Sequence, residues 1–114
     1  MPFDYQPRRG QEYKPMDLNA MLITNKGMTS IMEMSGSSLE SLGIFPKDWL
    51  IVDRSRKPQA ESVVIALYEG KTLFRVFHKS LDGYRLLGDH LAPIKVDEDV
   101  QILGTITYSI RRLS

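Results

Sequence analysis

The fold is decided by residues 49–77, which read WLIVDRSRKPQAESVVIALYEGKTLFRVF. Three short runs within this stretch are rich in β-branched and aromatic residues, as buried strands are: Trp49–Val52, Val63–Leu67 and Leu73–Phe77. Glu69 and Gly70, between the second and third runs, are typical of a tight hairpin turn. The stretch therefore predicts antiparallel strands that are neighbours in one sheet.

The flanking sequence extends the same pattern in both directions. Asp82 and Gly83 indicate a second hairpin, which leads into a strand at Tyr84–Leu87. Toward the N-terminus we predict a strand at Ile31–Met34 and, after the N-cap residue Asp17, a short amphipathic helix that contains Leu18, Met21 and Leu22. Apolar and polar side chains alternate in the last segment of the chain. We therefore expect a strand there with a polar face of Thr105, Thr107 and Ser109 and an apolar face of Ile102, Ile106, Tyr108 and Ile110.

These elements predict a mainly β domain over residues 17–114, with an antiparallel sheet and one or two short helices. Residues 1–16 contain three prolines and one glycine without a hydrophobic period, so we expect an extended N-terminal arm there. Tyr5 and Tyr13 in this arm could contact a protein partner. A chain of 114 residues with 42% hydrophobic residues is long enough for one core but hardly for two.

Composition excludes several classes of function. The net charge of +1 creates no global field toward nucleic acid or a membrane surface. Cysteine is absent, which rules out disulfides, thiolate metal sites and thiol catalysis. No apolar run approaches the roughly 20 residues that a membrane-spanning helix needs. We therefore expect a cytoplasmic protein without a metal or cofactor, and we expect neither membrane binding nor sequence-specific nucleic-acid binding.

The stretch Ser35–Ile44 carries the candidate chemistry. Ser37 and Glu40 have the spacing of a capping box, and Gly43 stands where a helix of about one and a half turns would end. This places Ser38 in the first turn of a short helix, where free backbone N–H groups could hold the oxyanion of a tetrahedral intermediate. The pattern by itself favours a structural role, because serines commonly cap the start of a helix.

Several segments together resemble the LexA and UmuD family of self-cleaving serine peptidases. The match runs without gaps through Arg75 and returns near the C-terminus; its segments are Asp17–Asn19, Ser35–Ser38, Gly43–Ile44, Asp48–Asp53, Ala92–Ile94 and Leu103–Ile106. The element Ser35–Ser38 followed by Leu-Ile-Val-Asp at residues 50–53 is far more specific for this family than either segment alone. The resemblance implies the C-terminal antiparallel β fold of that family.

In that family a serine attacks a peptide bond of its own N-terminal arm, and a buried, neutral lysine takes the proton of the serine. The resemblance puts Ser38 at the position of the nucleophile and Arg75 at the position of the lysine. A guanidinium stays protonated up to about pH 12, so Arg75 cannot act as the general base. Ser37 and Leu39 also stand where the family has aspartate and methionine. We therefore expect an inactive peptidase site.

Two further points favour an inactive site. The family cuts an Ala-Gly or Cys-Gly bond, and no glycine of this chain follows alanine or cysteine. Met1 also lies close to where processed UmuD begins, as if the chain started in the activated form. Lys71 is the nearest alternative base, but four strand residues place it about 13 Å from the position of Arg75.

The resemblance implies a homodimer that serves a UmuC-like error-prone DNA polymerase during SOS translesion synthesis. A RecA filament is the second partner that it implies. Two alternatives remain open at this stage: an active serine peptidase of the same type that cleaves another chain, and the dimerisation domain of a LexA-like or phage-like repressor.

The remaining polar residues indicate no further site. The basic residues fall into two groups without interleaved aromatic residues, so we expect solvated turns and tails rather than a nucleic-acid patch; the groups are Arg54, Arg56 and Lys57, and Arg111 with Arg112. His78 and His90 have no carboxylate or serine at a spacing that would indicate a catalytic triad. We interpret both histidines as ordinary polar positions.

Overall fold

The computed structural model describes residues 17–23 and 27–114, so the predicted arm and its two tyrosines lie outside the described residues. The elements in chain order are α1 (Leu18–Leu22), β1 (Thr29–Glu33), the 3-10 helix η1 (Glu40–Leu42), β2 (Trp49–Asp53), β3 (Ser62–Tyr68), β4 (Lys71–Ser80), β5 (Gly83–Leu87), β6 (Ile94–Lys95) and β7 (Val100–Ile110). Neither helix is long and apolar enough to cross a membrane.

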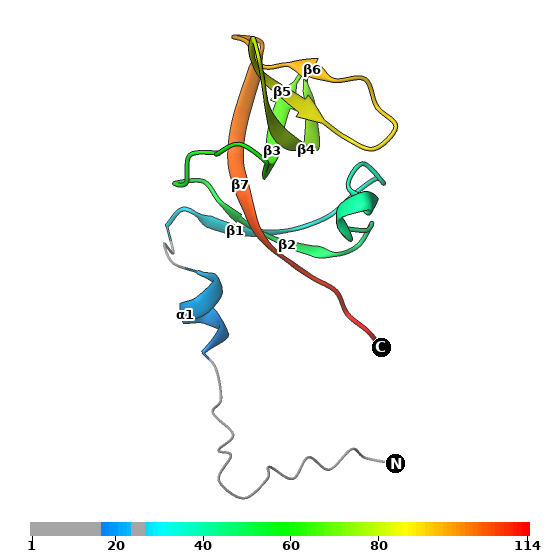
Figure 1. The fold of residues 1–114 in the computed structure, drawn as a ribbon. Helices are drawn as coiled ribbons and strands as arrows, with labels where there is room; N and C mark the ends of the chain where they lie inside the picture. Colours follow the sequence, from blue (N-terminus) through cyan, green and yellow to red (C-terminus); the bar gives the residue numbers. More distant parts are fainter. Residues whose placement is uncertain (1–16, 24–26) are drawn as a thin grey trace, which may run out of the picture.

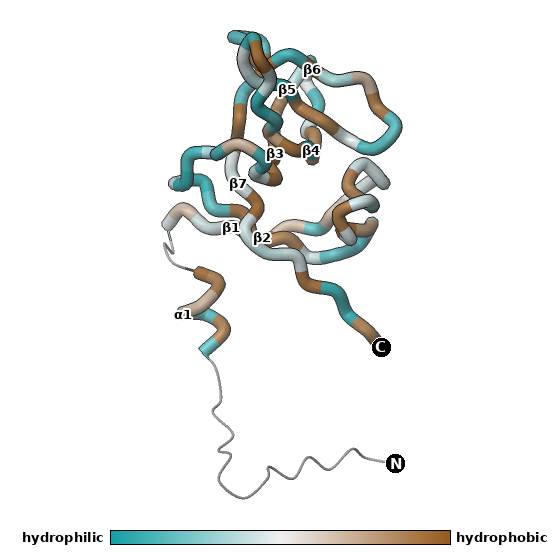
Figure 2. The backbone as a smooth tube through the Cα atoms, in the orientation of Figure 1, coloured by the Kyte–Doolittle hydropathy of each residue, from teal (hydrophilic) through white to brown (hydrophobic). Residues whose placement is uncertain are grey.

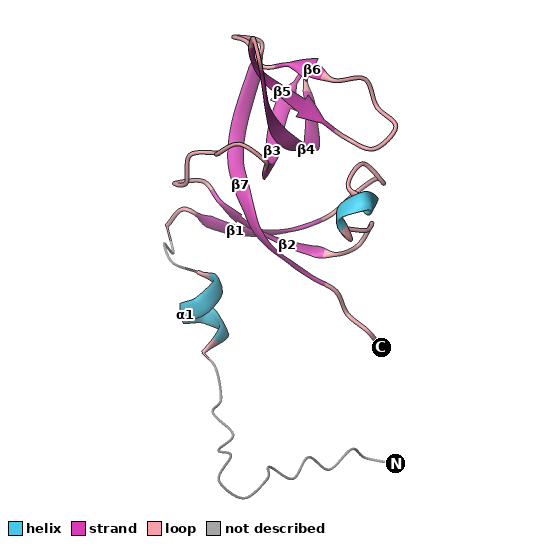
Figure 3. Cartoon of the chain, viewed as in Figure 1, coloured by secondary structure: helices cyan, strands magenta, loops and turns pink. Residues whose placement is uncertain are grey.

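The described strands form one antiparallel sheet of seven strands, in the order β1-β2-β7-β3-β4-β5-β6 (Figure 1). Figure 3 shows that strands and loops make up most of the domain and that the two short helices lie outside the sheet. The predicted mainly β, antiparallel class is therefore confirmed.

Both predicted hairpins are present, although the second turns at Leu81 and Asp82, with Gly83 already the first residue of β5. In the first, Tyr68 pairs with Lys71 around a two-residue turn, and Glu69 and Gly70 both have positive φ angles, 51° and 74°. Positive φ at both central residues is the geometry that matches the twist of the flanking strands. The helix at Leu18–Leu22 is also confirmed, with the Asp17 carboxylate accepting a hydrogen bond from the backbone N–H of Ala20.

Two hydrophobic clusters form the core. The first core cluster lies between the β1-β2 end of the sheet and its centre; its buried members are Met34, Leu39, Ile44, Leu50, Val52, Ile65, Phe74 and Ile106. The second core cluster lies on the other side of β3 and contains Val64, Ala66, Phe77 and Leu86. Strand β3 supplies residues to both clusters, as its continuous apolar run predicts. In Figure 2 the central strands carry long hydrophobic stretches, while the turns at the top of the view are hydrophilic.

Strand β7 joins the two ends of the sheet. It pairs with β2 through its C-terminal half and with β3 through its N-terminal half (Figure 1). Each ladder has one irregularity, opposite Ile51/Val52 on β2 and opposite Ile65/Ala66 on β3. A β-bulge bends a strand and increases its twist. The two irregularities therefore let β7 pair with β2 through one half and with β3 through the other.

The predicted single apolar face of residues 102–110 is wrong, because each irregularity reverses the alternation of side chains. Ile102 packs on the second core cluster, whereas Ile106 belongs to the first, on the opposite side of the sheet. Beyond the second irregularity, Tyr108 and Ile110 are exposed. Thr105, predicted on the polar face, is buried, and its hydroxyl donates to the carbonyl oxygen of Arg56 at 3.0 Å.

Gly104 of β7 lies tightly against Val52 and Asp53 at the end of β2. A Cβ atom at this position would lie 2.6 Å from Cγ1 of Val52 and 3.4 Å from the carbonyl oxygen of Asp53. Val52 is a buried member of the first core cluster, so its side chain cannot swing away into solvent. The crossing of the two strands therefore requires glycine at position 104.

Gly104→Ala should lower the free energy of unfolding by about 2 kcal/mol, because an extra methyl group in a filled core forces its neighbours out of place. Chemical denaturation monitored by circular dichroism measures the change. The control is Gln101→Ala, an exposed position on the same strand, which should change the stability by less than about 0.5 kcal/mol. Equal stability of the two variants would contradict this account.

Candidate functional site

Ser38 lies in the loop between β1 and β2, in a turn just before η1. The predicted place of Ser38 inside a helix, with Ser37 as cap, is wrong, because η1 covers only Glu40–Leu42 and its N-cap residue is Leu39. Leu39 is 1% exposed and anchors the loop in the first core cluster, so tertiary packing overrides the local capping signal. Gly43 ends the helix as predicted, with a left-handed φ of 80°.

Ser38 and Arg75 meet at one backbone carbonyl. Ser38 Oγ donates a hydrogen bond to the carbonyl oxygen of Phe74 at 2.9 Å, and Arg75 Nη1 donates to the same oxygen at 2.8 Å. Strand β4 carries Phe74 and Arg75 in the middle of the sheet, where it pairs with β3. The structure thus brings the two predicted site residues side by side, although they are 37 positions apart in the chain.

The connection between β5 and β6 holds the Ser38 loop against this part of the sheet. The backbone N–H of Asp89 donates to the carbonyl oxygen of Ser38 at 2.8 Å. The Asp89 carboxylate accepts from the hydroxyl and the backbone N–H of Ser41, at 2.6 and 2.7 Å. These two bonds hold the pKa of the Asp89 carboxyl below its usual range. Sequence reasoning missed Asp89, because nothing in its local pattern points to Ser41.

Arg75 is half-buried, and burial lowers the pKa of its guanidinium from a value far above neutral. The group therefore stays charged at any physiological pH. Gly88 leaves the space that its side chain occupies: a Cβ atom at position 88 would lie 2.9 Å from Cδ of Arg75. Among the described residues, Arg75 Nε is the one buried side-chain nitrogen or oxygen without a hydrogen-bond partner.

Two cavities flank Ser38. The first, of about 360 Å³, has mainly apolar walls with two carboxylates at its edge; its lining includes Leu39, Leu42, Val76, Leu87, Glu61 and Asp89. The second, of about 240 Å³, contains Arg75 and is lined mostly by the Ser38 loop and the start of β4, with Asp89 and Leu91 on the far side. Ser38 and Asp89 line both cavities, so a ligand in one could extend past Ser38 into the other.

Comparison with known proteins agrees with this arrangement. The model of the family described as Peptidase S24-like matches residues 4–107. The chain belongs to the Peptidase S24-like family. It is 30% identical over 105 residues to a LexA repressor of Corynebacterium efficiens, a match that covers 90% of this chain and 44% of that protein. It is 31% identical over 103 residues to the protein ImpA of Escherichia coli, across 85% of this chain and 68% of ImpA.

A LexA repressor of Caldicellulosiruptor saccharolyticus is 34% identical over 85 residues, which is 73% of this chain and 42% of that protein. The chain therefore spans less than half the length of these LexA repressors. The comparisons support a domain of the LexA and UmuD type, with the S24 fold that the sheet has.

The S24-like domain contains a histidine-carboxylate pair that sequence reasoning missed. His78 Nδ1 lies 2.6 Å from Oε1 of Glu61, a contact that the spacing along the chain did not indicate. The two residues are 17 positions apart, and they meet because Ser62 of β3 pairs with Phe77 of β4. Only the strand register could have revealed this pair. Within the described part of the chain, no group of three or more His, Asp or Glu side chains could hold a metal ion.

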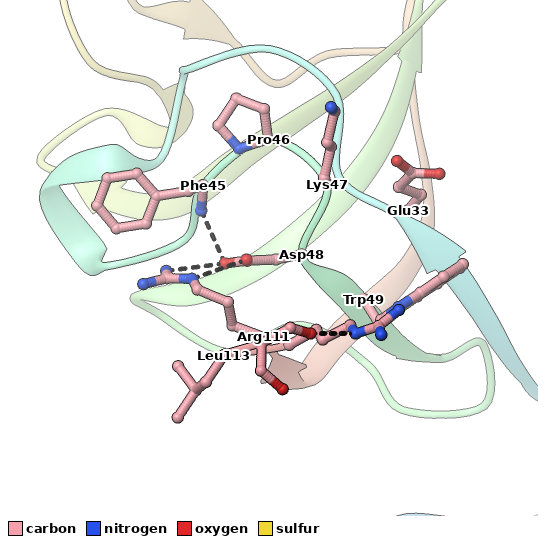
Figure 4. A pocket seen from close by; sticks show the side chains of 10 residues that line it. Glu33, Phe45, Pro46, Lys47, Asp48, Trp49, Arg111 and Leu113 are labelled. Atoms are coloured by element: carbon pink, nitrogen blue, oxygen red, sulfur yellow. Dashed lines mark hydrogen bonds and ion pairs between the residues drawn. The ribbon is translucent and has the colours of Figure 1, made fainter.

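We expected Arg111 to lie in a solvated tail. Instead, its side chain binds the loop that leads from η1 into β2 (Figure 4). Its Nε and Nη2 atoms lie 2.9 and 3.0 Å from the two carboxylate oxygens of Asp48, which is only 3% exposed. Nη2 also donates to the carbonyl oxygen of Gly43, and the guanidinium lies 4.3 Å from the ring centroid of Phe45. The Arg111 guanidinium, helped by the backbone N–H of Phe45, holds the pKa of the Asp48 carboxyl below its usual value.

Arg54 also has a structural partner, since its side chain donates to the carbonyl oxygens of Gly27 and Met28 next to β1. The exposed positions of Arg56 and Lys57 agree with the predicted solvated turn.

The ion pair between Asp48 and Arg111 should make stability depend on pH. Because the pKa of Asp48 is lowered by folding, its contribution is complete above the ordinary value of 3.8 and is lost as the pH falls through the lower folded value. Asp48→Asn should therefore be clearly less stable than the unmodified protein at about pH 7, and the difference should shrink toward about pH 2.5. Urea denaturation at both pH values measures it.

The matched control is Asp82→Asn, which removes a carboxylate that pairs with Arg85 on the surface. Surface pairs contribute little, so this variant should remain close to the unmodified protein at both pH values. A loss of stability in Asp48→Asn that does not change with pH would contradict the ion-pair account.

Proposed function

We propose that this S24-like domain is an accessory subunit of an error-prone translesion polymerase, similar to processed UmuD, and that its peptidase site does not cleave peptides. The observation that carries the second part is the guanidinium at the lysine position. A serine nucleophile needs a neighbour with a free lone pair to accept its proton, and a guanidinium has none. The Ser38 hydroxyl donates to the carbonyl oxygen of Phe74, which is not a base.

The partner role rests on the resemblance to UmuD from Asp17 onward. We expect a UmuC-like polymerase subunit as the main partner, with a RecA filament as the second. Affinity purification of the tagged chain from its source cell tests this expectation, because a polymerase subunit should co-purify with the chain. The rival candidate is the C-terminal domain of a LexA-like repressor, which the 30% identity to the Corynebacterium efficiens LexA repressor favours. Recovery of a repressor polypeptide instead of a polymerase would establish that rival.

We also infer that the domain works as a homodimer. Strand register places four exposed apolar side chains on the outer face of β1, β2 and β7, away from the first core cluster: Ile31, Trp49, Tyr108 and Ile110, which are 59, 47, 41 and 42% exposed. An apolar patch of this kind next to an edge strand is typical of a protein interface. In a two-fold dimer each protomer would offer this same patch.

Light scattering should therefore give about 26 kDa, twice the 13.0 kDa of one chain. Tyr108→Glu should give a monomer, because a charge within the patch would be desolvated by the second copy. Leu81→Glu is the matched control, since Leu81 is fully exposed on the β4-β5 turn, outside the patch, and should leave the dimer intact. A monomeric unmodified protein would contradict the inference.

A lysine at position 75 should restore peptide cleavage at Ser38. The unmodified chain should leave an Ala-Gly peptide intact up to about pH 10, whereas Arg75→Lys should cleave it at a rate that rises with pH. A lysine at this half-buried position would have a lowered pKa and could accept the proton of Ser38. Mass spectrometry of the peptide measures cleavage, and the double variant Ser38→Ala/Arg75→Lys should be inactive.

Of two informative outcomes, the first would contradict the proposal, and the second would contradict only the expectation that a single residue separates this site from a working one. Cleavage by the unmodified chain that Ser38→Ala abolishes would establish an active peptidase. Inactivity of both the unmodified chain and Arg75→Lys would show that more than one residue separates this site from a working one, with Ser37 and Leu39 as the next candidates.

A further inference from the structure

Arg75 is a half-buried cation without a counter-ion among the described residues. Its guanidinium makes one hydrogen bond, from Nη1 to the carbonyl oxygen of Phe74, and its Nε is buried without an acceptor. None of the ion pairs in the described part of the chain includes Arg75. A guanidinium has five N–H donors in a planar fork that matches the two oxygens of a carboxylate. Nη2 makes no hydrogen bond with the described residues and is not among the buried atoms, so its N–H groups have unused capacity for an anion.

The neighbouring carboxylates are already occupied. Both oxygens of Asp89 accept hydrogen bonds from Ser41, and Glu61 is paired with His78. Neither carboxylate forms an ion pair with Arg75, so the described residues supply no direct counter-ion for its guanidinium. Burial of an unpaired charge is costly, so an anion that reaches Arg75 gains the interaction that the protein itself does not supply.

The cavity beside Arg75 is open to a ligand of limited size and charge. It has a volume of about 240 Å³, and its lining combines the serines of the Ser38 loop and Asp89 with apolar residues, Leu73, Phe74 and Leu91. The Asp89 carboxylate in the same cavity would repel a phosphate group with two negative charges about twice as strongly as a carboxylate with one, so the site favours the carboxylate. The adjoining cavity of about 360 Å³ has Leu42, Val76 and Leu87 in its walls, which suit an apolar side chain.

The geometry points to a binding site for the C-terminal carboxylate of a peptide, held by the Arg75 guanidinium in one cavity, with the apolar last side chain in the other. Ser38 stands between the two cavities, where its hydroxyl can contact the peptide. The inference rests on the part of the proposed function that denies cleavage, because a bound peptide has to survive. Under this inference, arginine at the position of the family's lysine turns a peptide-cleaving site into one that binds the C-terminal carboxylate of a peptide.

The test compares two peptides that differ only in the charge of their end. Acetyl-Ala-Ala-Leu with a free carboxylate and the same peptide with a C-terminal amide are titrated into the full chain, and backbone amide NMR shifts give both the affinity and the position of binding. The free acid should bind about tenfold more tightly than the amide, as expected for a charge-assisted, bidentate contact. The shifts should centre on residues 36–41 and 87–90.

Two variants link the preference to Arg75. Arg75→Met keeps a long apolar side chain without the charge, so the acid and amide peptides should bind equally. Gly88→Ala changes no charge but places a Cβ atom 2.9 Å from Cδ of Arg75, so it should also reduce the preference by displacing the side chain. The control is Arg85→Met, which removes an arginine paired with Asp82 on β5 and should leave the preference unchanged.

Equal binding of acid and amide to the unmodified chain, or a preference that survives in Arg75→Met, would overturn the inference. Acetate that competes as tightly as the peptide would overturn the peptide assignment, because the apolar cavity would then contribute nothing. Mass spectrometry of a longer Ala-Gly peptide in parallel samples separates the two proposals. Its cleavage by the unmodified chain would overturn the proposed function, whereas loss of the acid preference with that peptide intact would overturn only the carboxylate site.

Discussion

The close crossing of β7 over β2 at Gly104 is the constraint on which the rest of the domain depends. Strand β7 connects the β1-β2 pair with strands β3 to β6, and its two bulges reverse the alternation of its side chains twice. The crossing closes the first core cluster around Ile106 and exposes the second half of the strand. The core and the outer apolar patch are therefore consequences of the same bend.

The candidate site depends on that core through Leu39 and Phe74. Both side chains are buried in the first core cluster, and they fix the Ser38 loop and strand β4 relative to each other. Asp89 ties the β5-β6 connection to the same loop, while Arg111 and Asp48 fix its other end. Hydrogen bonds from three separate parts of the chain thus converge on nine residues of irregular backbone, 35–43, which by themselves have no regular structure except η1.

Lysine and arginine are both long, basic side chains, and the sheet accommodates the arginine because Gly88 leaves room for its stem. The chemistry of the two differs sharply. A buried lysine can lose its proton and serve as a base, whereas a buried guanidinium keeps its charge and its donors. In the function proposed above, the fold of a peptidase persists without the reaction, and the charge that blocks proton transfer is the one proposed to bind an anion.

The sequence by itself determined six of the seven described strands, the two hairpins, the helix at Leu18–Leu22 and the S24 family, because these depend on local periodicity, turn residues and short motifs. It also singled out Ser38 and Arg75. Tertiary structure decided which faces of β7 are buried, because a bulge is invisible in an alternating sequence. It also decided that Arg111 pairs with Asp48, that His78 pairs with Glu61 and that Ser38 precedes its helix. These outcomes depend on strand register and on the burial of Leu39, which bring together residues that no spacing along the chain connects.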